Sequence, residues 1–251
     1  MLHGCGQDAQ AFADSTRMNV LARRQGVVVL YPEQDRLANP QGCWNWFDTR
    51  SGRAQREAAS IMAAIDQTCL LHGADRTRVA VAGLSAGASM AALLATRHPD
   101  RFRAVAMHSG VAAGAAHSAL TALGAMRGRR VGPALSAAAA APGCAGLPPL
   151  LVVQGLNDTV VVPANAEAAV RRWAEDCQAQ PLPRRYAQRG QRYPVAITEY
   201  RQGRRTRASL VEVAALAHAW SGGAAGLAFS DARGPDASRM ILAFFRKALA
   251  D

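Results

Sequence analysis

Three residues in this sequence have the types and the order that nucleophilic acyl chemistry needs: Ser85, Asp158 and His218. A serine hydroxyl is a weak nucleophile, so a histidine must take its proton. A carboxylate must then fix the tautomer of that histidine and stabilise its charged form. We place all three in loops at strand ends, and expect a covalent acyl intermediate with no metal and no organic cofactor.

Ser85 carries the strongest local signal. Gly83-Leu84-Ser85-Ala86-Gly87 is a G-x-S-x-G element, Val79–Ala82 before it suits a buried strand, and a helical pattern starts at Ala88. A nucleophile on such a tight strand-to-helix turn needs nearly side-chain-free neighbours two residues before and after it. The competing interpretation is a small-residue turn in a chain rich in alanine and glycine.

The acid and the base each have competitors. His108 also ends a predicted strand, but it precedes the acid in the sequence, whereas the order Ser85, Asp158, His218 is that of the α/β-hydrolases. The remaining histidines lie at helix ends, in a low-complexity segment or near the N-terminus: His72, His98, His117 and His3. For Asp158 the alternative is a turn-forming aspartate ahead of a helix.

An oxyanion hole requires two convergent N–H groups. The residue after the nucleophile, Ala86, supplies one, and Cys5 after the His3-Gly4 turn is the candidate for the other. Aromatic residues stand near the predicted site, and we expect three of them to form a substrate-binding wall: Trp44, Trp46 and Trp220. The alternative for Trp44 and Trp46 is a loop that packs onto the domain.

The elements that position these residues alternate between strands and helices, which predicts an α/β fold with a doubly wound, mostly parallel sheet and helices on both faces. The expected strands are Val27–Tyr31, Val79–Ala82, Ala104–Met107 and Leu150–Val153, followed by a hairpin of Ile197–Tyr200 and Ser209–Val213. The expected helices are Asp14–Gln25, Arg53–His72, a helix ending near Arg97, Asn165–Cys177 and Ala237–Ala250. We expect one catalytic domain over residues 1–251, with the Ala/Gly-rich segment 111–146 as a lid or surface excursion.

The N-terminus is abrupt, because only Met1 and Leu2 precede the His3-Gly4 turn and no signal peptide is present. We expect Met1 to lie inside a longer protein whose N-terminal strands are missing here. The alternative is an authentic start with a shortened strand.

Charge and cysteine content exclude several classes of function. The net charge is +11, and nearly all the basic residues are arginines, some of them gathered in Arg184–Arg207. A solvated basic face is favoured there over a surface for an anionic polymer or membrane. No zinc-finger spacing or recognition helix points to nucleic acid. No apolar run is long enough to span a bilayer, and the five cysteines form no C-x-x-C pair.

Several motifs together resemble the polyhydroxybutyrate depolymerase family of esterases, which includes feruloyl-esterase-like members. The matching strings are HGCGQ at 3–7, YPEQ at 31–34, NPQGCWNWF at 39–47, RVAVAGLSAGASMAALLA at 78–95, HSG at 108–110, HAWSGG at 218–223 and GPDASR at 234–239. The resemblance implies an α/β-hydrolase fold and esters of short hydroxy acids or aromatic acids as substrates. It gives Ser85, Asp158 and His218 the roles derived above, and implies an extracellular or periplasmic location.

The chain departs from the family pattern in three places. The acid loop reads QGLND, the turn before the histidine is Ala215-Leu216-Ala217, and Ala88 replaces a glycine that often follows the nucleophile turn. In the fold that the resemblance implies, the strand before His3 lies between Val27–Tyr31 and Val79–Ala82. Only two residues of that strand are present, so we expect a gap of unpaired backbone groups in the sheet.

Cys5 and Cys43 belong to two neighbouring motifs of this set, and our hypothesis is a disulfide between them; the alternative is two buried thiols. The predicted function is a serine carboxylic ester hydrolase acting on polyhydroxyalkanoate-type or short hydroxy-acid esters. One alternative is a feruloyl or acetylxylan esterase, or another acyl hydrolase, with the same three residues. The other is an inactive fragment or a remnant that binds anionic polymers.

Overall fold

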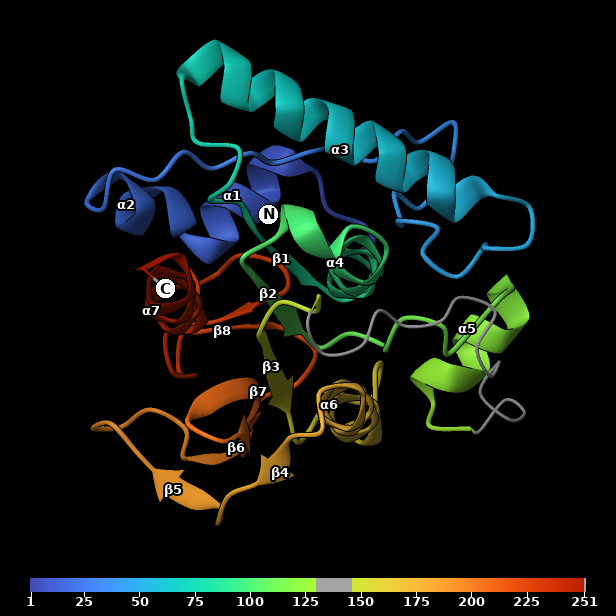
Figure 1. The fold of residues 1–251 in the computed structure, drawn as a ribbon. Coiled ribbons are helices and arrows are strands. Elements are labelled where there is room, and N and C mark those ends of the chain that lie inside the picture. Colours follow the sequence, from blue (N-terminus) through green and yellow to red (C-terminus); the bar gives the residue numbers. More distant parts are fainter. Residues whose placement is uncertain (130–145, 251) are drawn as a thin grey trace.

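The computed structural model describes residues 1–129 and 146–250 of the chain. In this part of the chain a seven-stranded sheet has the order β1-β2-β3-β7-β6-β4, with β5 also paired to β6 (Figure 1). Four strands run parallel: β1 (Ala80–Leu84), β2 (Ala104–His108), β3 (Leu150–Gly155) and β7 (Arg205–Val213). The antiparallel edge is β6 (Val195–Gln202), β4 (Gln180–Pro181) and β5 (Arg185–Ala187). The predicted hairpin is β6 and β7.

Helices cover both faces of the sheet, as the alternation of strands and helices predicts. One face packs against α3 (Arg53–His72), α4 (Ala86–Arg97) and α6 (Ala164–Asp176), and the other against α1 (Ala9–Thr16), α2 (Met18–Arg23) and α7 (Ala237–Ala250). Successive strand side chains point to opposite faces. Val105 and Met107 of β2 therefore join the first cluster, and Ala104 and Ala106 the second.

The helix prediction is accurate for α3 and wrong for the first helical segment. That segment divides into α1 and α2 because Arg17 adopts a left-handed conformation with φ 54°. Asp8 caps α1 by accepting the Ala11 N–H at 2.7 Å, so the helix begins before Asp14, its expected first residue. On α3, Leu70 is exposed.

The N-terminal residues lie where the implied fold places them. Leu2 donates its N–H to Ala82 O at 2.8 Å and accepts from the Leu84 N–H at 3.1 Å, which makes a parallel bridge to β1. On its other side the Met1 amino group donates to Leu30 O at 2.8 Å. The segment Val27–Tyr31 is not a strand, contrary to expectation. Its neighbour toward β1 is only these two residues, so a ladder of backbone bonds cannot form.

The Ala/Gly-rich segment contains one described helix, α5 (Ala119–Met126), which Ser118 caps. Residues 130–145 of the expected lid or excursion lie outside the described part. In the ranges 1–129 and 146–250, no helix combines the length and apolar character that crossing a membrane requires.

Candidate active site

The carboxyl ends of β1, β2, β3 and β7 meet at one edge of the sheet, and this edge carries the predicted residues. Ser85 follows β1 directly, and its N–H donates to His108 O at the end of β2 at 2.9 Å. Asp158 follows β3, and His218 lies in the loop after β7. In open α/β sheets, active sites form at this edge because the strand-end loops converge there.

Ser85 has a strained backbone, with φ 56° and ψ −119°, between β1 and the first turn of α4. A non-glycine residue at positive φ is uncommon, and strained positions of this kind cluster at functional sites. The two glycines of the motif are needed for space. A Cβ on Gly83 would lie 2.3 Å from the backbone of Gly87, and one on Gly87 would lie 2.2 Å from Leu2 O.

Asp158 and His218 make a short hydrogen bond, with 2.7 Å between Oδ2 and Nδ1. The carboxylate also accepts the N–H groups of Val160 and Val161 at 2.9 Å each, and Gln154 Nε2 at 3.2 Å. Burial alone would raise the pKa of Asp158. The hydrogen bond and charge of His218, together with the two backbone donors, outweigh burial and hold that pKa below its ordinary value. The acid is therefore ionised and points at His218.

The loop that carries His218 rests on the acid loop. Asn157 donates its N–H to Leu216 O at 3.0 Å, and a Cβ on Gly155 would lie 2.2 Å from that same oxygen. With Nδ1–H donated to Asp158, the Nε2 lone pair of His218 is the basic site. The Ser85 hydroxyl makes no hydrogen bond within the described residues. Catalytic hydrogen bonds often tighten only when substrate is bound.

His108, the competing candidate for the base, is fully buried and already engaged. Its Nε2 accepts the Ser221 N–H at 3.1 Å, which places the ring proton on Nδ1, 3.2 Å from Ser109 Oγ. Burial first, and the nearby His218 second, lower the pKa of His108 to about 3. The neutral ring has no free lone pair with which to take a proton from Ser85.

The predicted oxyanion turn adjoins the nucleophile. A Cβ on Gly4 would lie 3.4 Å from Ser85 Cβ, and no acceptor in the described residues takes a hydrogen bond from the N–H of Cys5 or of Ala86. His3 Nδ1 donates to Gly4 O at 2.8 Å, while its Nε2 accepts from the Gln34 N–H at 3.1 Å. Because the C=O and N–H of a trans peptide point in opposite directions, His3 also fixes the orientation of the Cys5 N–H.

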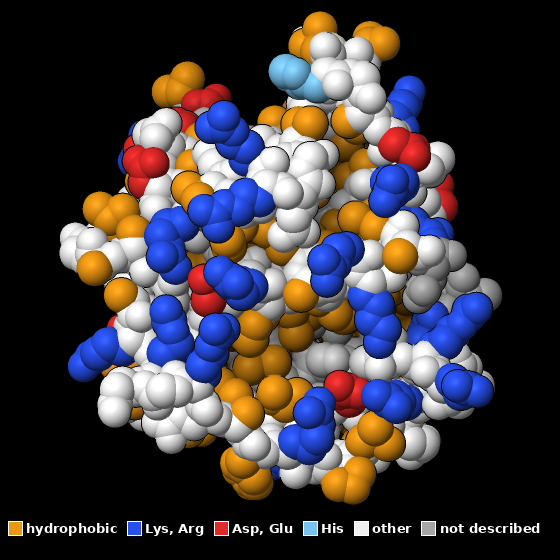
Figure 2. All heavy atoms as spheres, turned by 90° about the vertical axis from the view of Figure 1, so that its left-hand side faces the viewer, with side chains coloured by type: hydrophobic (Ala, Val, Ile, Leu, Met, Phe, Trp, Pro, Cys, Tyr) orange, Lys and Arg blue, Asp and Glu red, His pale blue; other side chains and the backbone are white. Residues whose placement is uncertain are grey.

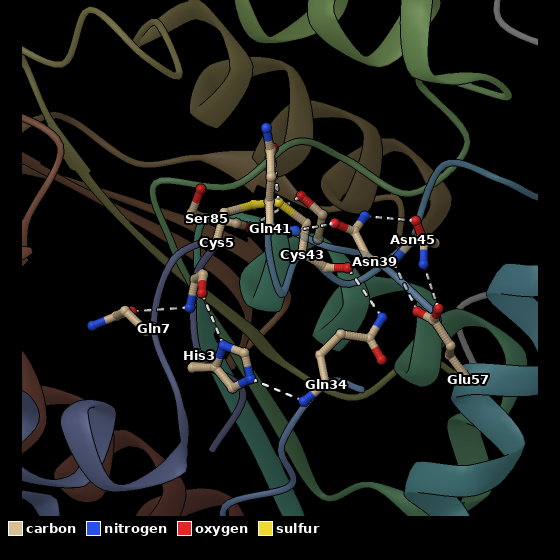
Figure 3. The surroundings of a disulfide bond; sticks show 12 residues. His3, Cys5, Gln7, Gln34, Asn39, Gln41, Cys43, Asn45, Glu57 and Ser85 are labelled. Carbon is tan, nitrogen blue, oxygen red and sulfur yellow. Dashed lines mark hydrogen bonds between the residues drawn. A yellow bond between two sulfur atoms is a disulfide. The ribbon is translucent and has the colours of Figure 1, made fainter. Parts of the chain in front are cut away.

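The hypothesis of a disulfide between Cys5 and Cys43 is confirmed: the sulfur atoms are bonded, and the Cα atoms lie 4.3 Å apart. Figure 3 shows the bond beside Ser85 and His3. It ties the oxyanion turn to the loop of residues 33–50. That loop is anchored in turn, because Asn45 donates its N–H to Glu57 Oε2 at 2.7 Å.

The three tryptophans predicted to face substrate are buried. Trp44 packs against the His3 ring at 5.5 Å, and Trp46 packs edge-on against Phe47 at 5.6 Å. Trp220 is 0% exposed, stacked on His108 at 5.1 Å with Phe12 against its edge. These contacts favour packing roles. Contact between any of the three tryptophans and substrate stays a prediction.

Sequence reasoning missed two residues near this edge. Gln154 donates a hydrogen bond to Asp158. Its position at the end of β3, in a strand that is otherwise apolar, could have indicated a role at this edge. Phe229 is an aromatic residue with φ 53° that is 40% exposed. It has no signal in the sequence, because a left-handed conformation is not expected of phenylalanine.

Three arginines of the arginine-rich segment pair with carboxylates. Arg184 bonds to Glu212, while Arg185 and Arg201 both reach Glu199, at 3.0 and 2.7 Å. On the face seen in Figure 2, arginines are spread among apolar and neutral side chains.

A cleft of about 490 Å³ contains none of the predicted site residues; it is lined by Arg189, Arg192, Pro235, Asp236, Arg239, Met240 and Ala243.

The fold, with its strained strand-to-helix serine, defines an α/β-hydrolase. Solved structures of this class superpose on the chain. An acetyl xylan esterase from Aspergillus awamori gives a TM-score of 0.67 at 20% identity, covering 86% of this chain and 81% of that one. SOBER1 from Arabidopsis thaliana gives 0.57 at 15% identity, covering 99% and 96%.

The family is narrower than the fold. The family model described as esterase PHB depolymerase matches residues 1–175, and the chain belongs to this family. Poly(3-hydroxyalkanoate) depolymerase C of Paucimonas lemoignei is 34% identical over 178 residues, which is 68% of this chain and 43% of the depolymerase. Feruloyl esterase B of Thermothelomyces thermophilus is 31% identical over 185 residues, 69% of this chain and 62% of that esterase. The chain thus spans less than two thirds of either relative.

Proposed function

We propose that the chain is a serine carboxylic ester hydrolase with Ser85 as nucleophile, His218 as general base and Asp158 as the acid that orients it. The observation that carries this proposal is the 2.7 Å bond from Asp158 to His218 at the sheet edge where Ser85 has φ 56°. Family membership supports the same reaction class.

The reaction proceeds in two halves. His218 Nε2 takes the hydroxyl proton of Ser85 as Oγ bonds to the ester carbonyl carbon. The tetrahedral intermediate then expels the alcohol, which receives that proton from His218, and leaves an acyl group on Ser85. Water repeats the sequence, its proton passing to His218, and releases the acid and free Ser85. Asp158 stays ionised throughout and stabilises the imidazolium.

The oxyanion of each intermediate is assigned to the N–H groups of Cys5 and Ala86. Both donors lack a protein acceptor among the described residues, so neither must break a bond to bind the developing charge. The N-terminus of α4 points at the same position, and the positive end of its helix dipole stabilises the negative charge there. Removing one such donor typically costs about 3–4 kcal/mol of transition-state stabilisation.

For substrate, the proposal is a polyhydroxyalkanoate-type or short hydroxy-acid ester, with feruloyl or acetylxylan esters as the alternative. The names of the relatives support both, since they include a poly(3-hydroxyalkanoate) depolymerase, feruloyl esterases and acetylxylan esterases. Parallel assays with 3-hydroxybutyrate oligomers, methyl ferulate and acetylated xylan separate them: the largest kcat/KM identifies the substrate class.

The test of the proposed function is labelling with a fluorophosphonate probe. The wild-type chain should form one covalent adduct, and Ser85→Ala none. Asp158→Asn should label about 10⁴-fold more slowly, because the histidine is then held in the wrong tautomer. Ser51→Ala, at an exposed serine, is the matched control and should label at the wild-type rate. A folded wild-type chain that forms no adduct would contradict the proposal.

The disulfide bears on location. Disulfides persist in oxidising compartments and are rare in the reducing cytosol. The Cys5–Cys43 bond therefore supports an extracellular or periplasmic site of action.

A remnant that binds anionic polymers is the less favoured function, since carboxylates already pair with Arg184, Arg185 and Arg201.

A further inference from the structure

Phe229 combines a strained backbone with a solvent-facing ring. It stands just before β9 (Ser230–Asp231), which pairs with β8 (Trp220–Ser221) close after His218. Its φ is 53° and its exposed fraction is 40%. A bulky residue at positive φ is an outlier that persists only where the surroundings over-determine it.

The surroundings hold this backbone firmly. The Phe229 carbonyl accepts the Trp220 N–H at 2.7 Å. The next residue, Ser230, donates its hydroxyl to Ala224 O at 2.7 Å, and the Ala224 N–H in turn donates to Ser15 O at 2.8 Å. These hydrogen bonds fix the backbone of Phe229, while the residue remains 40% exposed to solvent. Core packing does not explain such an arrangement, because a buried ring would bury more apolar area.

The ring faces the oxyanion turn. Its edge atoms lie 3.9 and 4.0 Å from the position of a Cβ on Gly6, the residue that follows Cys5. The corresponding position on Gly4 lies 3.4 Å from Ser85 Cβ. The turn of residues 4–6 thus adjoins Ser85 at Gly4 and the Phe229 ring at Gly6. The Cys5 N–H, which is assigned to the oxyanion, therefore belongs to a turn that borders Ser85 on one side and the Phe229 ring on the other.

We propose that Phe229 is a specificity-determining residue, the apolar wall that receives the acyl side chain of the ester. This inference rests on the proposed esterase function. The proposal predicts that the enzyme prefers esters whose acyl group extends beyond acetyl with an apolar part, such as alkyl-substituted or aromatic acids. Acetyl esters should be poorer substrates. We expect an acetyl group to end short of the ring, so that Phe229 contributes little to its binding.

The test keeps one leaving group and varies the acid. The p-nitrophenyl esters of acetic, butyric and hexanoic acid are compared for wild type, Phe229→Ala and Phe229→Leu. We expect Phe229→Ala to lower kcat/KM for the hexanoate about tenfold, the lower end of the range for lost apolar contacts in a pocket. The acetate should change less than twofold. Phe229→Leu, which restores apolar bulk, should recover most of the hexanoate rate.

The control is Leu37→Ala, at an apolar side chain that is 94% exposed on the 33–50 loop, and it should leave all three rates unchanged. Equal losses for acetate and hexanoate in Phe229→Ala would show that the ring only supports the loop, and would overturn the inference while the esterase function stands. Unchanged selectivity would overturn it as well. If the wild-type chain forms no fluorophosphonate adduct and turns over no ester, the proposed function fails and the inference fails with it.

Discussion

The Nε2 atom of His108 accepts a hydrogen bond from the backbone N–H of Ser221 at 3.1 Å. The carbonyl of the same histidine accepts the Ser85 N–H at 2.9 Å. One buried residue therefore joins the nucleophile turn to the strand that follows the His218 loop. Its ring is neutral, since burial and the neighbouring His218 lower its pKa to about 3.

Variants of His108 can show whether the residue acts through the hydrogen-bond acceptor at Nε2 or through the packing of its ring. His108→Leu leaves the Ser221 N–H buried without an acceptor, and we expect the free energy of unfolding in urea to fall by about 1–3 kcal/mol. His108→Gln can keep an acceptor near the Nε2 position and should restore most of the fluorophosphonate labelling rate lost in His108→Leu. His72→Leu, at an exposed histidine, is the control. Equal labelling rates for the leucine and glutamine variants would show that the acceptor is irrelevant.

The depressed pKa of His108 also predicts a pH dependence of stability. In the unfolded chain this histidine takes up a proton below pH 6.5, whereas in the folded chain it stays neutral down to about pH 3. The unfolded state binds more protons between these values, so stability falls as the pH falls through this window. For one group the slope is about 1.4 kcal/mol per pH unit. Urea unfolding across pH 4–6 should give a shallower slope for His108→Gln than for wild type; parallel slopes would contradict the assignment.

His3 orients the Gly4–Cys5 peptide, so its loss should affect the transition state more than substrate binding. We expect His3→Ala to lower kcat by about 10–10³-fold, up to the cost of losing one oxyanion donor, with KM changed little. Steady-state kinetics on a p-nitrophenyl ester measure both terms. His98→Ala, at a helix end, is the control. A rise in KM at constant kcat would instead assign His3 to substrate binding.

The Cys5–Cys43 disulfide should act on both stability and rate. It closes a loop with a sequence separation of 38, and loops of this size gain about 3–4 kcal/mol on the chain-entropy model. The Cys5→Ser/Cys43→Ser double variant should lose that much free energy of unfolding and should label more slowly with fluorophosphonate. Cys69→Ser, at a buried free thiol, is the control for serine substitution. A titratable thiol count that does not rise by two on reduction would disprove the bond in solution.

The sequence predicts the parts of the fold that depend on local patterns. The strand before Ser85, the helix Arg53–His72 and the β6–β7 hairpin appear close to their expected bounds, because apolar runs and turn residues mark them. The predicted strands place Ser85, Asp158 and His218 in strand-end loops, and the structure brings Asp158 and His218 into contact. Parallel strands make this inference strong, since their carboxyl ends share one edge.

Local sequence patterns do not predict features that depend on an unusual backbone conformation or on contacts with distant parts of the chain. Arg17 and Phe229 adopt positive φ, which no propensity assigns to arginine or phenylalanine. Val27–Tyr31 has a strand-like composition, but pairing depends on the chain beside it, and there only Met1 and Leu2 lie between it and β1. Trp220 is adjacent to the HAWSGG histidine yet fully buried, because ring orientation follows from packing against Phe12 and His108.

The close approaches around the strand ends set limits on directed evolution of this site. At Gly83, Gly87 and Gly155 an added Cβ would lie 2.2–2.3 Å from backbone atoms, which cannot move aside as a flexible side chain can. In a saturation library these three positions should return almost only glycine among active clones. Diversity is better directed to side chains that are exposed near this edge: Leu156 and Val160 in the loop after β3, and Phe229 before β9.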